Sequence, residues 1–111
     1  MRSAGDRLWI GIEGPTVGEE EADHLRAVAP GGIILFRRNI RDRDQVCALT
    51  ERLRSILHAD LHIVVDQEGG AVVRFEQECT VFPGNLALGA AAASDRARAI
   101  EWGREWGRVS G

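Results

Sequence analysis

Residues 31–39 read Gly-Gly-Ile-Ile-Leu-Phe-Arg-Arg-Asn, a short apolar run between a glycine pair and three polar residues. A continuous apolar run is typical of a strand that is covered on both faces, as in a parallel sheet. The run therefore predicts a buried strand over Ile33 to Phe36. Pro30-Gly31-Gly32 just before it commonly ends a helix, so we expect a helix to precede this strand.

Two further runs rich in β-branched residues predict strands at Leu8 to Ile12 and at Leu61 to Val65. Longer segments with helical spacing separate the three runs, and this alternation indicates βαβ units with a parallel sheet. Crossovers between parallel strands are right-handed as a rule. We therefore expect an α/β fold with three adjacent parallel strands in chain order and the helices on one side.

Three helices are expected from the spacing of apolar residues. The first begins near Gly18, where three glutamates favour the positive end of the helix dipole, and it ends at Pro30. In the second, Asp42 and Gln45 resemble a capping box. The third follows a long loop, with Ser94 as its cap. The inward-facing residues expected for the three helices in turn are Ala22, Leu25 and Val28; Val46, Leu49, Leu53, Ile56 and Leu57; and Ala99, Trp102, Trp106 and Val109.

The composition excludes several classes of protein. The 111 residues are enough for one small domain. All 14 basic residues are Arg, so the chain has no lysine for Schiff-base chemistry or for a phosphate-binding loop. The net charge is −3, and Arg is interspersed with acidic residues. Without a basic stripe or a polybasic segment, we expect neither nucleic acid nor a membrane surface as a partner.

The longest apolar stretch, Leu86 to Ala93, falls far short of the roughly 20 residues of a transmembrane helix. Glu13 interrupts the region where a signal peptide would be hydrophobic, so we expect a cytoplasmic protein. Cys47 and Cys79 are too far apart for a Cys-x-x-Cys motif and are expected to be reduced, buried thiols. The histidines lack metal-ligand spacing, and we expect no metal and no cofactor. They are His24, His58 and His62.

Ligands of parallel α/β folds bind at the loops that follow the carboxyl ends of the strands. These loops begin with Glu13-Gly14, Arg37-Arg38-Asn39 and Asp66-Gln67-Glu68-Gly69-Gly70. In the third loop, Asp66 and Glu68 would face the same side of a continuing strand, with Cα atoms roughly 6.6 Å apart. Retaining glycosidases hold two carboxyl groups about 5 to 5.5 Å apart. An acidic pair also suits a helix cap or an ion pair with Arg, so spacing alone does not establish catalysis.

The Gly69-Gly70 pair is typical of a turn, although it would also let the backbone approach an anionic ligand closely. The flanking residues lack the Gly-x-Gly-x-x-Gly and Lys-Ser/Thr patterns of nucleotide-binding loops, which favours the turn. Arg74 could form a structural ion pair with Asp66 or Glu68, or it could hold a polar ligand together with them.

Several blocks of the sequence resemble glycoside hydrolase family 3, and most closely its bacterial β-N-acetylhexosaminidase branch. They are residues 31–39, residues 64–75 (Val-Val-Asp-Gln-Glu-Gly-Gly-Ala-Val-Val-Arg-Phe), Phe82-Pro83 and residues 87–90 (Ala-Leu-Gly-Ala). The resemblance implies a TIM-type (β/α)8 barrel, which needs about 250 residues. Residues 1–111 would then be the amino-terminal portion of a truncated catalytic barrel, supplying its first three βα units.

The resemblance also implies an activity, the removal of terminal N-acetylglucosamine from cell-wall-derived saccharides by a retaining mechanism, as part of peptidoglycan recycling. The family's acid/base loop, which reads like Lys-His-Phe-Pro-Gly-His-Gly, does not occur in this sequence. That loop and the nucleophilic Asp are expected beyond Gly111. The chain would then contain no catalytic residue and would be inactive by itself.

The resemblance carries over two substrate-binding residues, Asp66 and Arg74, whose counterparts in the family bind hydroxyls of the terminal sugar. A carboxylate accepts from two hydroxyls and a guanidinium donates through a planar fork, so the pair suits a vicinal diol. Glu68 also matches the family block, and a structural role is expected for it. The family commonly has Arg in place of Ala71 and Gln in place of Val73, so the finer polar network differs.

Two alternatives stay open at the level of sequence. The chain could be a small stand-alone α/β ligand-binding module, with Gly69-Gly70 serving an anionic ligand. It could also be an interaction fragment that folds with a partner completing its sheet, because an unpaired strand edge would otherwise be exposed. The sequence does not fix the aglycone, the choice between hydrolysis and transfer, or the oligomeric state.

Overall fold

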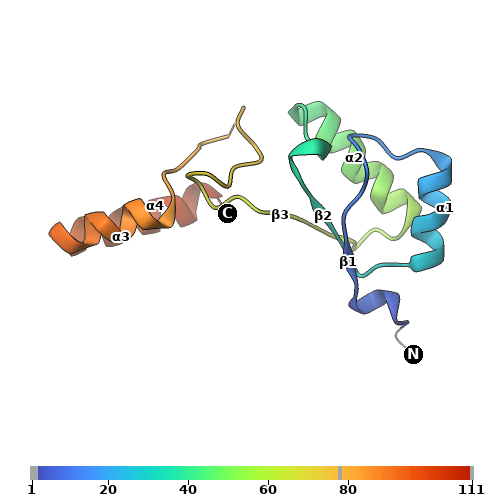
Figure 1. Cartoon of the computed structure of the whole chain (residues 1–111), viewed down its shortest axis with the longest axis horizontal. Helices are drawn as coiled ribbons and strands as arrows, with labels where there is room; N and C mark the ends of the chain where they lie inside the picture. The colour runs from blue at the N-terminus through green and yellow to red at the C-terminus, as the bar shows by residue number, and fades with distance from the viewer. Residues whose placement is uncertain (1–2, 78, 111) are drawn as a thin grey trace. The chain divides into compact units, whose positions relative to one another are not determined.

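The computed structural model describes residues 3–77 and 79–110, which form two compact units (Figure 1). The first unit ends at Val65 and the second begins at Asp66. The side chains of residues 109 and 110 are outside this description, and so is the inward position expected for Val109.

The first unit is an α/β structure. Its elements in chain order are a 3-10 helix η1 (Gly5–Arg7), β1 (Trp9–Ile10), α1 (Glu19–Val28), β2 (Gly32–Leu35), a second 3-10 helix η2 (Arg37–Asn39), α2 (Arg43–Ile56) and β3 (His62–Val65). The strands form one parallel sheet in the order β1-β2-β3. The prediction of adjacent parallel strands in chain order is therefore confirmed.

Helices α1 and α2 cover the same face of this sheet (Figure 1), as expected from the sequence. Ile33 and Leu35 of β2 are buried beneath them, because alternate residues of a strand point to the same face. Of the inward residues expected for these two helices, Val28, Val46 and Leu57 are only half-buried. The buried core consists of Ile12, Val17, Ala22, Leu25, Ile33, Leu35, Leu49, Leu53, Ile56 and Leu61.

The amino terminus of α2 is capped as the sequence predicts, with one difference. Asp42 accepts a hydrogen bond from the Gln45 N–H (2.9 Å). The Gln45 Oε1 accepts from the Arg41 N–H (2.8 Å), one residue before the expected partner. The Gln45 amide also donates to the Pro15 and Asn39 carbonyls (2.7 and 2.9 Å). The cap therefore connects α2 to the loops that follow β1 and β2.

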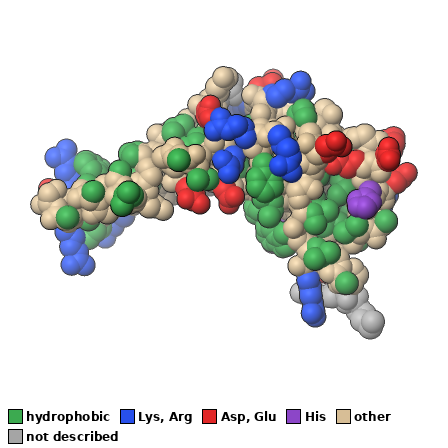
Figure 2. Space-filling model, viewed as in Figure 1, with side chains coloured by type: hydrophobic (Ala, Val, Ile, Leu, Met, Phe, Trp, Pro, Cys, Tyr) green, Lys and Arg blue, Asp and Glu red, His purple; other side chains and the backbone are tan. Residues whose placement is uncertain are grey.

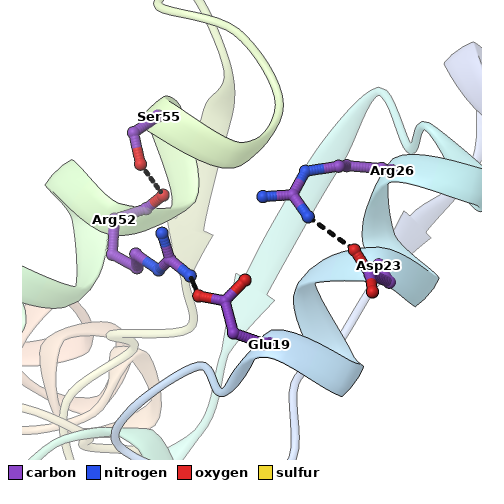
Figure 3. Close-up of polar contacts among 5 residues, drawn as sticks. All are labelled: Glu19, Asp23, Arg26, Arg52 and Ser55. Carbon is purple, nitrogen blue, oxygen red and sulfur yellow. Dashed lines mark hydrogen bonds and ion pairs between the residues drawn. The ribbon is translucent and has the colours of Figure 1, made fainter.

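An ion pair joins the two helices on the surface. Arg52 of α2 donates to Glu19 of α1, and Arg26 pairs with Asp23 within α1 (Figure 3). The carboxylates of both pairs are exposed. Exposed pairs of this kind contribute at most about 1 kcal/mol, so the buried core holds the helices in place.

The face of the sheet opposite these helices carries an aromatic contact that spans all three strands. The Trp9 ring lies over Gly32, where an added Cβ would be 2.7 Å from it, and meets the His62 ring edge-on at 5.9 Å between centroids. Trp9 is 45% exposed and Val64 is 37% exposed. Only glycine at position 32 leaves room for this contact.

A buried amide holds the carboxyl ends of β1 and β2 together. Asn39 is completely buried. Its Oδ1 accepts from the Phe36 N–H (2.9 Å), and its Nδ2 donates to the carbonyls of Ile12 (3.1 Å) and Gly14 (2.8 Å). The Arg38 Nε also donates to the Ile12 carbonyl (3.0 Å). Side chains therefore take the place of strand pairing at Ile12, which explains why β1 is shorter than the predicted Leu8 to Ile12.

The second unit contains two helices where the sequence predicted one. They are α3 (Asn85–Ser94) and α4 (Arg96–Ser110). Residues 85–94 lie in the long loop that was expected before the last helix, but they are rich in alanine, the strongest helix former. The predicted Ser94 cap is wrong. Ser94 ends α3, and Asp95 caps α4 by accepting from the Arg98 N–H (3.0 Å).

Apolar side chains are exposed along both helices of this unit (Figure 2). Leu86 on α3 is 89% exposed, and Ile100 and Trp102 on α4 are also exposed. The expected inward face of α4 is therefore confirmed at Ala99, which is buried, and wrong at Trp102. Within the described residues, no helix is long and apolar enough to cross a membrane.

The Asn39 contacts generate a stability prediction. Asn39→Ala removes the side-chain partner of the Phe36 N–H and of the Gly14 carbonyl and leaves the Ile12 carbonyl with Arg38 alone, which should lower the free energy of unfolding by about 2–3 kcal/mol. Arg26→Ala removes only the exposed pair with Asp23 and should cost less than about 1 kcal/mol. Urea unfolding followed by circular dichroism measures both variants. Equal losses would contradict the role assigned to Asn39.

Candidate functional site

The second unit begins with the Asp66–Gly70 segment that the sequence singled out. Asp66 directly follows the last residue of β3. The carboxylates of Asp66 and Glu68 are exposed, and neither forms a hydrogen bond or ion pair with another residue in the described part of the second unit. Both acidic groups of the segment therefore face solvent.

The glycine pair forms a turn, in agreement with the favoured interpretation. The Glu68 N–H donates to the Val72 carbonyl (2.9 Å), and the Val72 N–H donates to the Gly69 carbonyl (3.2 Å). Gly69 and Gly70 have φ values of 79° and 57°, which side-chain-bearing residues rarely adopt. The Gly70 N–H donates to the Phe82 carbonyl (3.1 Å). This N–H is used within the protein and cannot serve an anionic ligand.

A second observation explains why this turn needs glycine. A Cβ on Gly69 would lie 2.4 Å from the Phe82 oxygen, and one on Gly70 would lie 3.1 Å from the backbone of Gly84. The turn therefore packs directly on the backbone of the Phe82-Pro83-Gly84 segment. The two blocks that the sequence compared with family 3 are thus in contact.

Gln67 connects the two sides of the turn. Its Oε1 accepts from the N–H groups of Arg74 (2.9 Å) and Phe75 (3.2 Å), and its Nε2 donates to the Phe75 carbonyl (3.1 Å). The sequence interpretation gave Gln67 no role. An uncharged amide beside two carboxylates was the only available signal, and it does not indicate which backbone groups the amide would reach.

Arg74 is half-buried, and its Nε is buried with no hydrogen-bond partner among the described residues. In that same part of the chain, Arg74 forms no ion pair with Asp66 or Glu68. The structural ion pair that the sequence left open is therefore not formed. A buried N–H without a partner is costly unless a ligand or water satisfies it.

An aromatic contact lies close to the same segment. The Phe82 and Trp106 rings stack at 4.9 Å between centroids. They line a hollow of about 180 Å³, together with Gln67, Glu68, Gly69, Thr80 and Asn85. Trp106 was expected only as an inward residue of its helix. Its contact with Phe82 shows that it also packs against the loop that precedes α3.

The loops of the first unit that the sequence also considered have structural roles. Asn39 and Arg38 bind backbone carbonyls, and Arg38 lies over the Phe36 ring at 4.8 Å. The Glu13 N–H donates to Glu21, beside an open hollow of about 760 Å³. Acidic side chains gather over α1 around it (Figure 2). In the described residues, no group of three or more His, Cys, Asp and Glu side chains could hold a metal ion.

The two cysteines and the three histidines are all exposed. Cys47 and Cys79 are free but exposed, so the expectation of buried thiols is wrong. Cys47 lies on the outer side of α2, where helical spacing from the buried Leu49 and Leu53 turns it to solvent. The three histidines are exposed, and His62 contacts the Trp9 ring.

Residues 8–107 match the profile described as "Glycosyl hydrolase family 3 N terminal domain". The chain belongs to glycosyl hydrolase family 3. A protein named beta-hexosaminidase from Xylella fastidiosa (strain 9a5c) is 38% identical over 94 residues, which are 85% of this chain and 28% of that protein. Another of the same name from Bordetella pertussis is 38% identical over 103 residues, 92% of this chain and 29% of that protein.

Solved structures agree with this family 3 assignment. NagZ from Neisseria gonorrhoeae in complex with N-trifluoroacetyl-D-glucosamine superimposes with a TM-score of 0.85 at 36% identity, over 92% of this chain and 31% of that one. A family 3 beta-N-acetylglucosaminidase from Paenibacillus has a TM-score of 0.71 at 39% identity, over 79% of this chain and 18% of that one. The family 3 chain described here thus spans less than a third of each of these relatives.

Two glycine substitutions in the second unit should have opposite effects on stability. Gly69→Ala forces a side chain into the left-handed region and against the Phe82 carbonyl, so it should lower the free energy of unfolding by at least about 1–2 kcal/mol. Gly89→Ala, in α3 with open space around it, should raise it by about 0.5–1 kcal/mol. Urea unfolding compares the two. A neutral Gly69→Ala would refute the described packing.

Proposed function

We propose that this family 3 chain is the amino-terminal part of a β-N-acetylhexosaminidase that removes terminal N-acetylglucosamine from cell-wall-derived saccharides. It would act in the cytoplasm, in peptidoglycan recycling. The observation that carries the proposal is the Asp66–Gly70 segment directly after β3, in a chain similar to NagZ, whose complex holds an N-acylated glucosamine analogue. The substrate partner is therefore a saccharide containing N-acetylglucosamine.

The proposed barrel architecture has support in the first unit. Parallel strands in chain order, with helices on one face, are what successive βα units of a TIM-type barrel require. In such barrels the active site lies at the carboxyl ends of the strands. β1, β2 and β3 would be the first three strands of the barrel, and the Trp9 and Val64 side chains would face its interior.

We assign Asp66 and Arg74 to the binding of sugar hydroxyls. The Asp66 carboxylate is exposed and accepts no hydrogen bond from the described residues of its unit, so both oxygens can accept from hydroxyls. The Arg74 Nε is buried without a partner among the described residues, so an oxygen atom of a ligand would satisfy it. A carboxylate and a guanidinium together recognise neighbouring hydroxyls as acceptor and donor.

Two positions reduce the number of polar groups in the proposed subsite. Ala71 is exposed and Val73 is buried with 5% of its surface exposed, where the family commonly has Arg and Gln. Neither alanine nor valine has a polar side-chain group for a sugar. More of the hydroxyl recognition would therefore fall on Asp66 and Arg74 than in relatives with the common residues.

The bond-breaking groups are proposed to lie outside this chain. A retaining mechanism needs a nucleophile that forms a glycosyl-enzyme intermediate and an acid/base that protonates the leaving group. No residue of this chain is assigned either role. Its contribution would be to bind the sugar ring so that groups from the rest of the barrel reach the glycosidic bond.

Removal of either subsite residue should impair a complete enzyme. Asp66→Ala and Arg74→Ala, made at the matching positions of a complete homologous enzyme, should each cost about 1 to 3 kcal/mol in transition-state binding, or roughly ten- to hundredfold in kcat/KM. Steady-state kinetics on a chromogenic N-acetylglucosaminide measures this, with thermal unfolding to verify intact folding. Wild-type kinetics in both variants would overturn the assignment.

The 111-residue chain by itself should have no glycosidase activity. Binding of hydroxyls supplies neither nucleophile nor acid, and only interactions that strengthen in the transition state accelerate the reaction. Purified chain is assayed against the same chromogenic substrate, with complete homologous enzyme as the positive control. Reproducible turnover by the chain would require a catalytic pair within it and would contradict the proposed division of roles.

A further inference from the structure

We infer that Gln67 is a positioning residue, which holds Arg74 at the correct distance from Asp66 to bind one sugar. This inference rests on the proposed function, because it assigns to Gln67 an effect that operates through Arg74. Gln67 itself is not assigned any contact with the substrate.

The geometry of the Gln67 side chain carries the inference. Gln67 is bonded in the sequence to Asp66, and its amide binds three backbone groups of Arg74 and Phe75. Both amide atoms are used, with the oxygen accepting twice and the nitrogen donating once. The Gln67 side chain therefore links the residue next to Asp66 to the backbone of Arg74.

Backbone pairing does not provide this link. Across the turn, the backbone hydrogen bonds join Glu68 to Val72 and Val72 to Gly69. Farther along the returning chain, the N–H groups of Arg74 and Phe75 both donate to the Gln67 side chain. Without the Gln67 amide, the N–H groups of Arg74 and Phe75 would lose the partner that they have across the turn.

The required accuracy explains why such a link would affect binding. Groups that act together on one ligand must be held to within about 0.5 Å, and a displacement of about 1 Å can cost as much as a hundredfold in rate. The three bonds are exposed to solvent, so water can replace them with little loss of global stability. Loss of the Gln67 amide should therefore affect the placement of Arg74 more than folding.

A double-mutant cycle in a complete homologous enzyme tests the inference. Gln67→Ala should lower kcat/KM roughly tenfold when Arg74 is present. In an Arg74→Ala background the same substitution should have less than about a twofold effect, because no guanidinium is left to position. Amide hydrogen exchange at Arg74 and Phe75 should become faster in Gln67→Ala, while exchange at Gly70, whose N–H binds Phe82, should not change.

Gln45 offers a matched control. Its side chain also binds three backbone groups, but in the first unit and away from Arg74 in the sequence. Any effect of Gln45→Ala on kcat/KM should be the same with and without Arg74. If Gln67→Ala fails to fold, Gln67→Met, which removes the amide and keeps the length of the side chain, takes its place in the cycle. Gln67→Glu, which keeps the acceptor for both N–H groups, should retain most of the activity.

The outcomes separate this inference from the proposed function. Equal losses from the Gln67 substitution in both backgrounds, or no loss when Arg74 is present, would overturn the positioning role and leave the sugar subsite standing. Wild-type kinetics in Arg74→Ala would overturn the subsite itself. A loss confined to enzymes that contain Arg74 supports both.

Discussion

The Asn39 side chain binds three backbone groups at the point where two parallel strands end, and the rest of the first unit is arranged around it. The amide is completely buried and reaches Phe36 just after β2 and Ile12 and Gly14 after β1. Gln45 extends the connection, because it binds both the Asn39 carbonyl and Pro15. Loops at strand ends cannot use a sheet ladder, so side-chain amides satisfy their backbone groups. This arrangement keeps the strand ends rigid where loops diverge.

The predictable parts of the fold were those with a strong local signal. The apolar run before Phe36 indicated the central strand, and Asp42 indicated the start of α2. Errors occurred where a tertiary contact overrides the local pattern, as at Ile12, and where helix propensity acts without helical periodicity, as in α3. Ile12 leaves the ladder because side chains bind its carbonyl, and α3 is helical although its alanine-rich sequence has no polar face. A single sequence does not reveal which distant side chain will bind a given backbone group.

The candidate site, like the fold, could be predicted only in part. The Asp-Gln-Glu-Gly-Gly block and its position after a strand could be found from the sequence, and so could the turn at its glycines. The absence of an ion pair between Asp66 and Arg74 within the described residues could not, since pairing depends on side-chain directions rather than spacing. The role of Gln67 was also invisible, because an exposed glutamine carries no charge or periodicity that would distinguish it from a solvated one.

Several contacts within the second unit hold its loop, and this bears on how the proposed site is built. The glycine turn packs on Phe82, the Gln67 amide binds the returning backbone, and Phe82 stacks on Trp106. All of these partners lie between Asp66 and the end of α4. Under the proposed function, ring recognition would then be set by one segment of the chain, while the bond-breaking groups, which must move protons and form a covalent intermediate, are supplied separately.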